Sequence, residues 1–493
     1  MDPAQSGRNW TTVDKDLNRV SRLEMATHYA ARPLVGVGAS LVFIVFGGLL
    51  AAYFVGISPG FMVVVAAAAV GAYMALNIGA NDVANNMGPA VGANALSMAG
   101  AIAIAAIFET AGALIAGGDV VSTISKGIID PASVAGANVF TWAMLAALLS
   151  AAIWVNIATV LGAPVSTTHS VVGGVMGAGI AAAGFTAVSW PTMGAIAASW
   201  VISPLIGGAI AAAFLAFIKW RIVYQPDMIA AARRWVPVLI GVMAGAFATY
   251  LALKGVKKII KIDMQSALLI GVAAAILGWM LSVPMIRTQA RGLENRKRSL
   301  RVLFSFPLIA SAALLSFAHG ANDVANAVGP LAAIVHAQEF GAAAGKVSLP
   351  LWVMVIGAFG ISLGLVLFGP KLIRMVGSQI TKLNPMRAYC VALSAAITVI
   401  VASWLGLPVS STHIAVGAIF GVGFFREWES ERRSKALNIA RGQSKRLAQE
   451  ERSRRKLVRR SHFMTIVAAW VITVPAAAVL SSVLFFALNA MFG

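Results

Sequence analysis

Long apolar stretches separated by short polar segments run through almost the whole chain. Most of these stretches are long enough to cross a bilayer, which takes about 20 residues per helix. The pattern predicts apolar spans at 34–56, 60–79, 94–117, 137–161, 169–187, 193–218, 236–253, 265–286, 302–318, 329–345, 350–370, 388–406, 408–425 and 463–491. We therefore expect an all-α integral membrane protein, a polytopic helical bundle in which some segments are re-entrant helical hairpins.

Composition supports this fold class. The chain of 493 residues is 59% hydrophobic and 11% charged, and its mean hydropathy is +0.83, whereas soluble domains carry roughly 25% charged residues. The single cysteine, Cys390, excludes a disulfide framework and a cysteine-based metal site. Residues 1–32 lack the charged and apolar regions of a cleaved signal, so we expect a cytoplasmic tail that is in part an amphipathic helix.

The net charge of +20 is concentrated in two segments between apolar spans. Segment 287–301 holds six basic residues and one acid, and segment 426–460 holds 13 basic residues and five acids. The positive-inside rule places both loops in the cytoplasm, which argues against a nucleic-acid partner. Loop 426–460 has a helix-forming composition, typical either of a solvated helix near the headgroups or of a regulatory or partner-docking element.

Two motifs recur in the same order, which indicates an internal repeat. Gly-Ala-Asn-Asp stands at 79–82 and 320–323, a separation of 241 residues. The sequences LGAPVSTTH (161–169) and LGLPVSSTH (405–413) follow, 244 residues apart. We predict two transport repeats, at about 60–187 and 302–425, and expect them to be inverted because a site between inverted repeats suits alternating access.

The repeats define the expected organisation of the chain. It comprises a cytoplasmic tail (1–32), a first repeat with flanking helices (33–218), connecting spans with a basic loop (219–301), a second repeat (302–425), a basic cytoplasmic loop (426–460) and a last transmembrane helix (461–493).

The two Gly-Ala-Asn-Asp motifs place carboxylates at membrane depth, where a charge costs several kcal/mol unless it is paired or hydrated. We expect glycine and asparagine to interrupt an apolar helix there, because helices break only where the freed backbone groups are satisfied. Freed carbonyls and side-chain oxygens would then bind Na⁺, or an aspartate would take up a proton. The alternative is helix packing through small residues and interhelical asparagine hydrogen bonds. The residues concerned are Asn81, Asp82, Asn85, Asn322, Asp323 and Asn326.

The two Ser/Thr motifs follow Pro164 and Pro408, which stop the preceding helix. A helix that restarts at Ser/Thr exposes free N–H groups and the positive end of its dipole, a ready anion site. The hydroxyls add donors without charge, which suits a tetrahedral oxyanion, and the alternative is ordinary N-capping. The donors are Ser166, Thr167, Thr168, Ser410, Ser411 and Thr412. His169 and His413 are expected to be hairpin-tip histidines satisfied by the backbone rather than metal ligands or proton relays.

Other charged residues lie in or beside the third apolar run. Glu109 stands in the middle of that run, so it is either functional or paired. Asp119, Lys126 and Asp130 follow at its end, and we expect them to be interfacial rather than ligating.

These motifs resemble the inorganic phosphate transporter (PiT) family. The shared elements are GANDVANN and GANDVANA, PVSTTH and PVSSTH, FETAG (108–112) and TISKGIID (123–130). The resemblance implies a secondary transporter that couples phosphate uptake to Na⁺ or H⁺, with inverted repeats, re-entrant hairpins and a homodimeric assembly. It implies cation sites at Asn81, Asp82, Asn322 and Asp323, an anion cage of the six Ser/Thr residues, and contact of both aspartates with a protonated phosphate oxygen.

The chain departs from the family pattern at one position. Many members carry a second glutamate ahead of the second PVS motif, where this chain has Ala392. We therefore expect the first repeat, with Glu109, to carry more of the cation coupling. Asn85, Asn326 and Glu109 complete the candidate cation ligands.

The resemblance also bears on the protein's class and location. The family includes sulfate permeases, so a sulfate permease of the same fold is the alternative function. No H-E-x-x-H or P-loop motif is present, and we expect neither an enzyme nor a cofactor beyond the coupling ion. The expected location is the cell inner membrane.

Overall fold

The computed structural model of this chain describes residues 12–56, 60–163, 165–255, 262–340, 349–379, 383–440 and 460–492. The long helices are α1 (Thr12–Val55), α2 (Phe61–Gly92), α3 (Met98–Ala116), α5 (Ala137–Leu161), α6 (Thr167–Ala183), α7 (Trp190–Ile218), α8 (Met228–Lys254), α9 (Met264–Gln289), α11 (Ser305–Phe340), α12 (Leu351–Gln379), α13 (Pro385–Trp404), α14 (Ser411–Ala440) and α16 (Arg460–Phe492). The short elements are α4 (Gly118–Ser122), η1 (Thr123–Gly127), η2 (Pro131–Ser133), η3 (Phe185–Ala187), η4 (Lys219–Val223) and α10 (Leu300–Leu303). Within these residues there is no β-strand, which confirms the all-α fold class.

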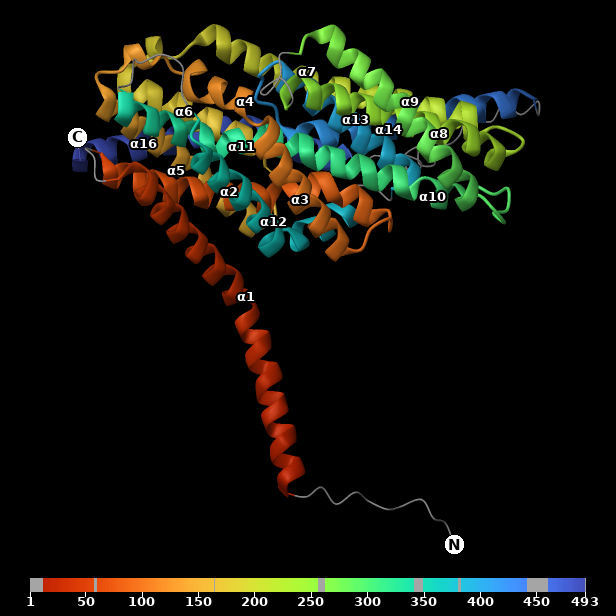
Figure 1. Ribbon diagram of the computed structural model, residues 1–493, viewed down its shortest axis with the longest axis horizontal. Coiled ribbons are helices and arrows are strands. Elements are labelled where there is room, and N and C mark those ends of the chain that lie inside the picture. The colour runs from red at the N-terminus through yellow and green to blue at the C-terminus, as the bar shows by residue number, and fades with distance from the viewer. Residues whose placement is uncertain are drawn as a thin grey trace.

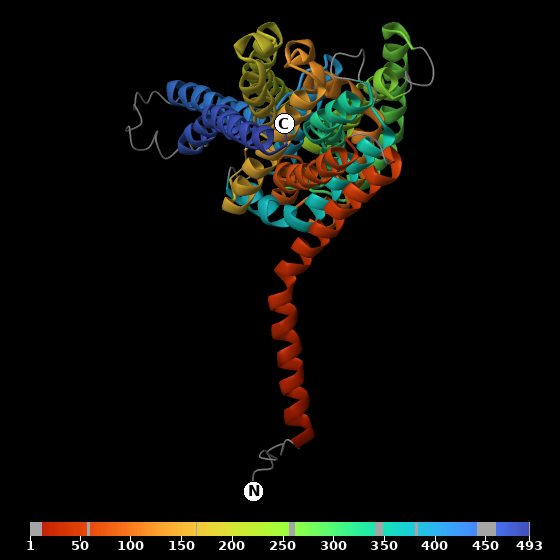
Figure 2. The ribbon, with the colours of Figure 1, turned by 90° about the vertical axis from the view of Figure 1, so that its left-hand side faces the viewer.

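Eleven of the described helical segments are long and apolar enough to cross a membrane. They make this a multi-pass membrane protein. Most of the helices lie side by side along the long axis of the molecule (Figure 1), and a view turned by 90° looks along many of them (Figure 2). α6, with 17 residues, and α14 are not among the eleven, and each begins at one of the two Ser/Thr motifs.

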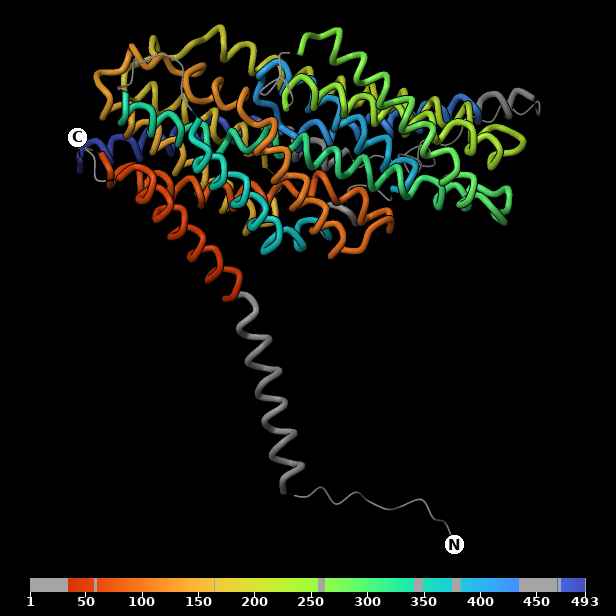
Figure 3. The backbone as a smooth tube through the Cα atoms, viewed as in Figure 1, coloured from red at the N-terminus to blue at the C-terminus, as the bar shows by residue number. Residues whose placement is uncertain are grey.

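The expected helix breaks at the two Gly-Ala-Asn-Asp motifs do not occur. α2 continues through residues 79–82 and α11 continues through 320–323, as the backbone trace shows (Figure 3). The predicted spans 302–318 and 329–345 are therefore one helix as far as Phe340, and 341–345 lie outside the described residues. The motif glycines serve helix packing instead of breaking the helix. A Cβ on Gly79 would lie 1.8 Å from the Ile361 carbonyl oxygen, and one on Gly320 would lie 2.1 Å from that of Glu109.

These glycine contacts also give the direction of the packed helices. Gly360 of α12 faces Ala75 of α2, and Gly369 faces Val83, so the two helices run in the same direction. α3 and α11 likewise run in the same direction, because Gly112 faces Phe317 and Gly117 faces Val324. Each motif helix thus packs closely along a helix of the other half.

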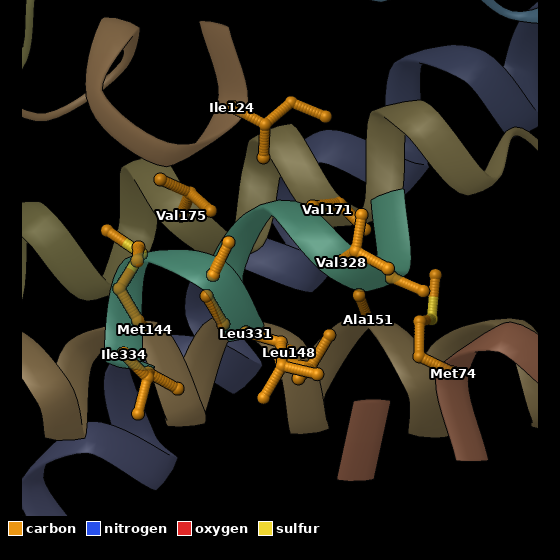
Figure 4. Packing of buried hydrophobic residues seen from close by; sticks show 14 of the residues in the cluster. Met74, Ile124, Met144, Leu148, Ala151, Val171, Val175, Val328, Leu331 and Ile334 are labelled. Carbon is orange, nitrogen blue, oxygen red and sulfur yellow. The ribbon is translucent and has the colours of Figure 1, made fainter. Parts of the chain in front are cut away.

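Two hydrophobic cores meet at the motifs. One contains α2 up to Ile78 and α11 from Val324 onward, and Figure 4 shows Leu331 of α11 in this core with Leu148 of α5. The other contains α2 from Val83 onward and α11 up to Ala321. Residues 79–82 of α2 and 322–323 of α11 lie between the cores and carry the asparagine and aspartate of each motif, so the site lies at the junction.

The ends of the chain differ in part from the expected boundaries. Residues 12–32 of the predicted tail are helical and continuous with the first apolar span in α1, whereas 1–11 lie outside the described residues. The helix expected in loop 426–460 is confirmed as far as Ala440, because α14 continues into it. Residues 441–459 are also outside the described part.

Candidate functional site

A histidine that the sequence analysis did not single out joins the acidic residues of both repeats. His319 lies on α11 one turn before Asp323, and its Nε2 is 2.9 Å from Asp323 Oδ2 and 3.8 Å from Asp82 Oδ2. Its Nδ1 faces Glu109 Oε2 at 3.3 Å. All four side chains are at most 1% exposed. The structure thus brings Asp82, Glu109 and Asp323 together around one imidazole ring.

The cluster contains more acidic than basic side chains. With all three carboxylates ionised, its net charge is negative even when the ring is protonated. Burying such an excess costs several kcal/mol unless cations neutralise it. One atom each from Asp82, His319 and Asp323 lies within 4.8 Å of the others, the spacing of a possible ion site. The buried oxygens Asp323 Oδ1 and Asn326 Oδ1 accept no hydrogen bond within the described part of the chain.

The Ser/Thr motifs from both halves reach this cluster. Thr167 Oγ1 donates to Asp82 Oδ2 at 2.8 Å, and Thr412 Oγ1 donates to Asp82 Oδ1 at 3.2 Å. Ser411 Oγ donates to Asp323 Oδ2 at 3.2 Å. Each of the first two hydroxyls lies at the start of a helix, α6 or α14. Neutral donors and two helix N-termini therefore surround the aspartates.

Two of the six predicted anion donors act as helix caps. Ser166 Oγ accepts from the His169 backbone N–H at 3.1 Å, and Ser410 Oγ accepts from that of His413 at 3.3 Å. The alternative of N-capping thus applies to these two serines. We call the two Ser/Thr motifs, residues 161–169 and 405–413, the first and second tips. Thr168 donates to the Val409 carbonyl oxygen at 3.0 Å and so joins the two tips.

The first asparagine of each motif binds the tip that follows in its own repeat. Asn81 Nδ2 donates to Thr159 Oγ1 at 3.0 Å and to the Ala163 carbonyl oxygen at 3.3 Å. Asn322 Nδ2 donates to Ser403 Oγ at 2.9 Å and to the Leu407 carbonyl oxygen at 3.3 Å. The partners are 244 residues apart, the separation of the Ser/Thr motifs, so the two contacts are equivalent. We call them the tip clamps.

The second asparagine of each motif reaches the tip of the other repeat. Asn85 Nδ2 donates to Thr412 Oγ1 at 2.8 Å, and Asn326 Nδ2 donates to Thr168 Oγ1 at 3.1 Å. Asn86, which the sequence analysis did not select, donates to Glu109 Oε1 at 2.8 Å. Both repeats therefore contribute to each side of the site, and Glu109 is paired as well as buried.

The remaining predicted polar residues lie outside the cluster. The rings of His169 and His413 contact each other edge-on with centroids 4.3 Å apart, so the two tips meet at their histidines. Asp119 forms an ion pair with Lys254 of α8. Asp130 caps η2 by accepting from the Ala132 N–H at 3.0 Å. These two aspartates do not ligate the central site, in agreement with an interfacial role.

The structure pairs Glu109 with a different position from the one expected. Gly320 approaches the Glu109 carbonyl, and the equivalent Gly79 approaches that of Ile361, so Ile361 on α12 is the counterpart of Glu109. Ala392 lies on α13, where the 244-residue separation relates it to Leu148 of α5. Both positions are apolar, so the site still has one glutamate, contributed by the first half.

One sequence signal could have identified His319. It is an ionisable residue inside an apolar run, the same signal that selected Glu109. It also precedes Asp323 by four residues, which places both side chains on one face of a helix. Asn86 offers no comparable signal, because an asparagine in a small-residue helix is equally typical of interhelical packing.

Comparisons with known proteins find relatives over most of this chain. A model of the phosphate transporter family matches residues 78–481. A putative phosphate permease of Helicobacter pylori strain J99 is 45% identical, over 96% of this chain and 99% of its own length. One from Pyrococcus abyssi is 36% identical, over 84% of this chain and 95% of its own length. A solved structure titled "The sodium-dependent phosphate transporter" is similar, with a TM-score of 0.78 and 33% identity, and covers 87% of this chain and 100% of that one.

Proposed function

We propose that this chain, which belongs to the phosphate transporter family, is a secondary active transporter that imports inorganic phosphate together with a cation. The observation that carries the proposal is the buried junction itself. Asp82 and Asp323 lie within hydrogen-bonding distance of hydroxyls from two tips that suit an oxyanion. Both aspartates and Glu109 face the imidazole of His319, and such a group of buried carboxylates suits a bound cation. The names of the similar proteins all refer to phosphate, which leaves the sulfate alternative without support.

The arrangement supports cotransport because phosphate alone would make the charge of the site more negative. A phosphate anion beside Asp82 and Asp323 would add negative charge to a cluster already in excess, so a cation must bind with it. Hydroxyls of Thr167, Ser411 and Thr412 can turn from the aspartates to phosphate oxygens, since hydroxyl rotors are free to reorient. The phosphate monoanion can in turn donate to a carboxylate. Sulfate has no proton to donate at neutral pH.

We infer that the repeats are inverted and that the tips are re-entrant. α3 follows α2 after the short segment 93–97 and thus returns across the bundle, and α11 runs parallel to α3. Equivalent helices α2 and α11 would then run in opposite directions. On this topology the C-terminal ends of α2 and α12 lie on the same side as the basic loop 287–301, which the positive-inside rule assigns to the cytoplasm.

Rocking of one repeat against the other around the fixed site would expose it to each side in turn. The tip clamps hold each tip to its own motif helix, whereas Asn85 and Asn326 bind the opposite tip. Contacts of the second kind cross between repeats, so they are the ones that must change when the repeats move. We propose that the hydrogen bonds of Asn85 and Asn326 to the opposite tips break and form again during the conformational cycle.

The proposal is tested by phosphate uptake into proteoliposomes under separately imposed Na⁺ and pH gradients. Uptake driven by one gradient and abolished with its collapse would identify the coupling ion. We expect Asp82→Asn and Asp323→Asn to lose concentrative uptake. Asp263→Asn is the matched control, because Asp263 caps α9 far from the cluster in sequence and asparagine also caps helices. Uptake at the wild-type rate by both site variants would refute the mechanism.

Competition and assembly test the remaining expectations. Excess unlabelled sulfate should leave phosphate uptake unchanged, and strong competition would revive the sulfate alternative. The family resemblance predicts a homodimer, and the expected bacterial location is the inner membrane. Light scattering of the detergent-purified protein, corrected for bound detergent, gives the mass of the assembly and would contradict the dimer if it found one chain.

A further inference from the structure

A cavity of about 870 Å³ lies outside the carboxylate cluster, between segment 37–44 of α1 and helices α2, α5 and α12. Apolar side chains such as Leu41, Ile44 and Phe368 form most of its wall. Asn77 and Asn156 form a polar part of the wall and hydrogen-bond each other, with Nδ2 of Asn156 donating to Oδ1 of Asn77 at 2.9 Å. The cavity is therefore amphipathic and opens beside α1.

A basic side chain of α12 lies at this cavity and contacts the end of α5. Lys371 lines the cavity and donates to the Val160 carbonyl oxygen, near the end of α5, at 3.4 Å. In the second repeat the equivalent carbonyl, that of Trp404, accepts from Lys254 at 3.2 Å, and Lys254 is neutralised by Asp119. Among the ion pairs of the described residues, none involves Lys371.

The equivalent volume in the second repeat is filled by protein. Leu76 lines the cavity, and its counterpart 241 residues later is Phe317. Phe317 packs edge-on against Phe247 and Tyr250 of α8, with ring centroids 5.1 and 6.2 Å apart. α8 thus supplies aromatic side chains where the first repeat has open space. In the first repeat, the described residues therefore leave a volume that is filled in the second repeat.

We propose that the cavity binds one anionic phospholipid, with the headgroup phosphate at Lys371 and Arg374 and an acyl chain along the apolar wall. Arg374 lines the cavity one turn after Lys371 on α12. α1 is 51% exposed at Val37 and 58% exposed at Leu41, as expected for a helix that faces lipid. In the topology proposed above, this end of α12 faces the cytoplasmic leaflet, which carries the anionic lipids.

The lipid would act on transport through the first tip clamp. Thr159, which lines the cavity, is also the side chain that accepts from Asn81. An acyl chain in the cavity would pack against the end of α5 and hold the first tip in place. The second tip has α8 beside it for the same purpose. Lipid binding itself does not depend on the proposed transport function.

The test uses the full chain, purified in detergent and stripped of lipid. The protein is titrated in separate series with palmitoyl-oleoyl phosphatidylglycerol, with the matching phosphatidylcholine and with inorganic phosphate alone, and its melting temperature is measured at each concentration. We expect saturable stabilisation by phosphatidylglycerol. The double variant Lys371→Gln, Arg374→Gln should bind it roughly 25-fold more weakly, from the usual contribution of two basic side chains near a headgroup.

Two further variants sharpen the test. Lys297→Gln, Arg298→Gln removes the same charge from the exposed loop 287–301 and should leave the titration unchanged. Leu41→Trp fills the cavity without changing charge and should weaken lipid binding, so it carries the test if the double variant does not fold. Equal stabilisation by both lipids, equal losses in the two charge variants, or a stabilisation by inorganic phosphate that the Lys371→Gln, Arg374→Gln variant abolishes would each overturn the proposal.

Discussion

The ring of His319 lies close to three carboxylates, those of Asp82 on α2, Glu109 on α3 and Asp323 on α11. Its Nε2 lies 2.9 Å from Asp323, and its Nδ1 lies 3.3 Å from Glu109. Without the ring, three buried carboxylates would face one another with less compensation. The residue therefore sets the balance of charge that the coupling cation completes.

We predict that His319→Gln lowers phosphate uptake at least tenfold while the protein remains folded. Glutamine can occupy the space but carries no positive charge, and hydrogen bonds to charged groups contribute about 1.5–3 kcal/mol each. Uptake into proteoliposomes at matched protein density is the measurement. His336→Gln, on the same helix beside Phe340, is the control and should transport normally. Normal uptake by His319→Gln would show that the ring is only a packing element.

The motif glycines allow a second prediction at the residue scale. Gly79→Ala and Gly320→Ala place a Cβ about 2 Å from a carbonyl oxygen of the adjacent helix, where only backbone could move aside. Overpacking typically costs 1–3 kcal/mol and more where backbone must shift. We expect both variants to melt at lower temperature and to lose monodispersity in size-exclusion chromatography.

Gly194→Ala in α7 is the matched control for this prediction. No atom lies within 4 Å of the added Cβ, so the substitution should be neutral or slightly stabilising. Equal effects at all three glycines would mean that helix propensity rather than close packing determines the result.

At the scale of helices, sequence reasoning succeeded where the chemistry was local. Ser166 and Ser410 cap the helices that follow them, and a serine directly before a helix is a good cap that can be predicted from the motif. The sequence did not allow us to predict that α2 continues unbroken through Asp82. A glycine in an apolar helix is compatible with a break or with a close neighbour, and only the position of α12 decides between them.

Contacts between distant helices were beyond the sequence for the same reason. No local sequence pattern links His319 to Glu109, because the two residues are 210 positions apart (319 − 109). They meet only because α3 and α11 pack through small residues. The repeat could have predicted one part of this, since whatever Gly320 contacts must have an equivalent at Gly79. It could not name Ile361, because α12 and α3 share too little sequence.

The two tip clamps give a prediction at the element scale. Asn81→Ala and Asn322→Ala each remove two donated hydrogen bonds and leave a tip carbonyl with one donor fewer. Each should destabilise the protein by about 1–3 kcal/mol, the usual cost of an unsatisfied buried group. Asn322 Oδ1 also accepts from the Val409 N–H at 3.3 Å, so thermal denaturation should show losses for both variants and a modestly larger one for Asn322→Ala. Asn295→Ala, which removes an exposed loop contact to Pro226, should have a smaller effect.

Different outcomes at the two clamps would also be informative. If Asn81→Ala destabilised the protein far less than Asn322→Ala, the equivalence of the tips would be wrong. The clamps would then have different structural roles despite their common sequence origin.

At the scale of the whole molecule, the site depends on where two hydrophobic cores stop. Each core contains one half of α2 and one half of α11, and the polar side chains occupy the short segments between them. Motion of one core against the other would change the distances within the site first. A small displacement at this junction would reach the aspartates directly, which suits the proposed alternating access.

The proposed orientation is open to a direct test by cysteine labelling. Cys390 is buried, so a Cys390→Ala background removes the single native thiol. Asn295→Cys, in the exposed loop after α9, should react with a membrane-impermeant maleimide only from the cytoplasmic face. Thr186→Cys, exposed in η3 after α6, should react only from the opposite face. The contrast follows because α6 returns from the first tip toward the end of the bundle at which α5 begins.

Inside-out vesicles and intact cells supply the two faces, and transport by each variant shows that its fold is preserved. The basic charge of 287–301 predicts the cytoplasmic side on energetic grounds, since positively charged loops are retained there. Labelling of both positions from one face would contradict the re-entrant topology of α5 and α6. Labelling from the two faces in the reverse order would leave the topology intact and show that positive charge does not set the orientation.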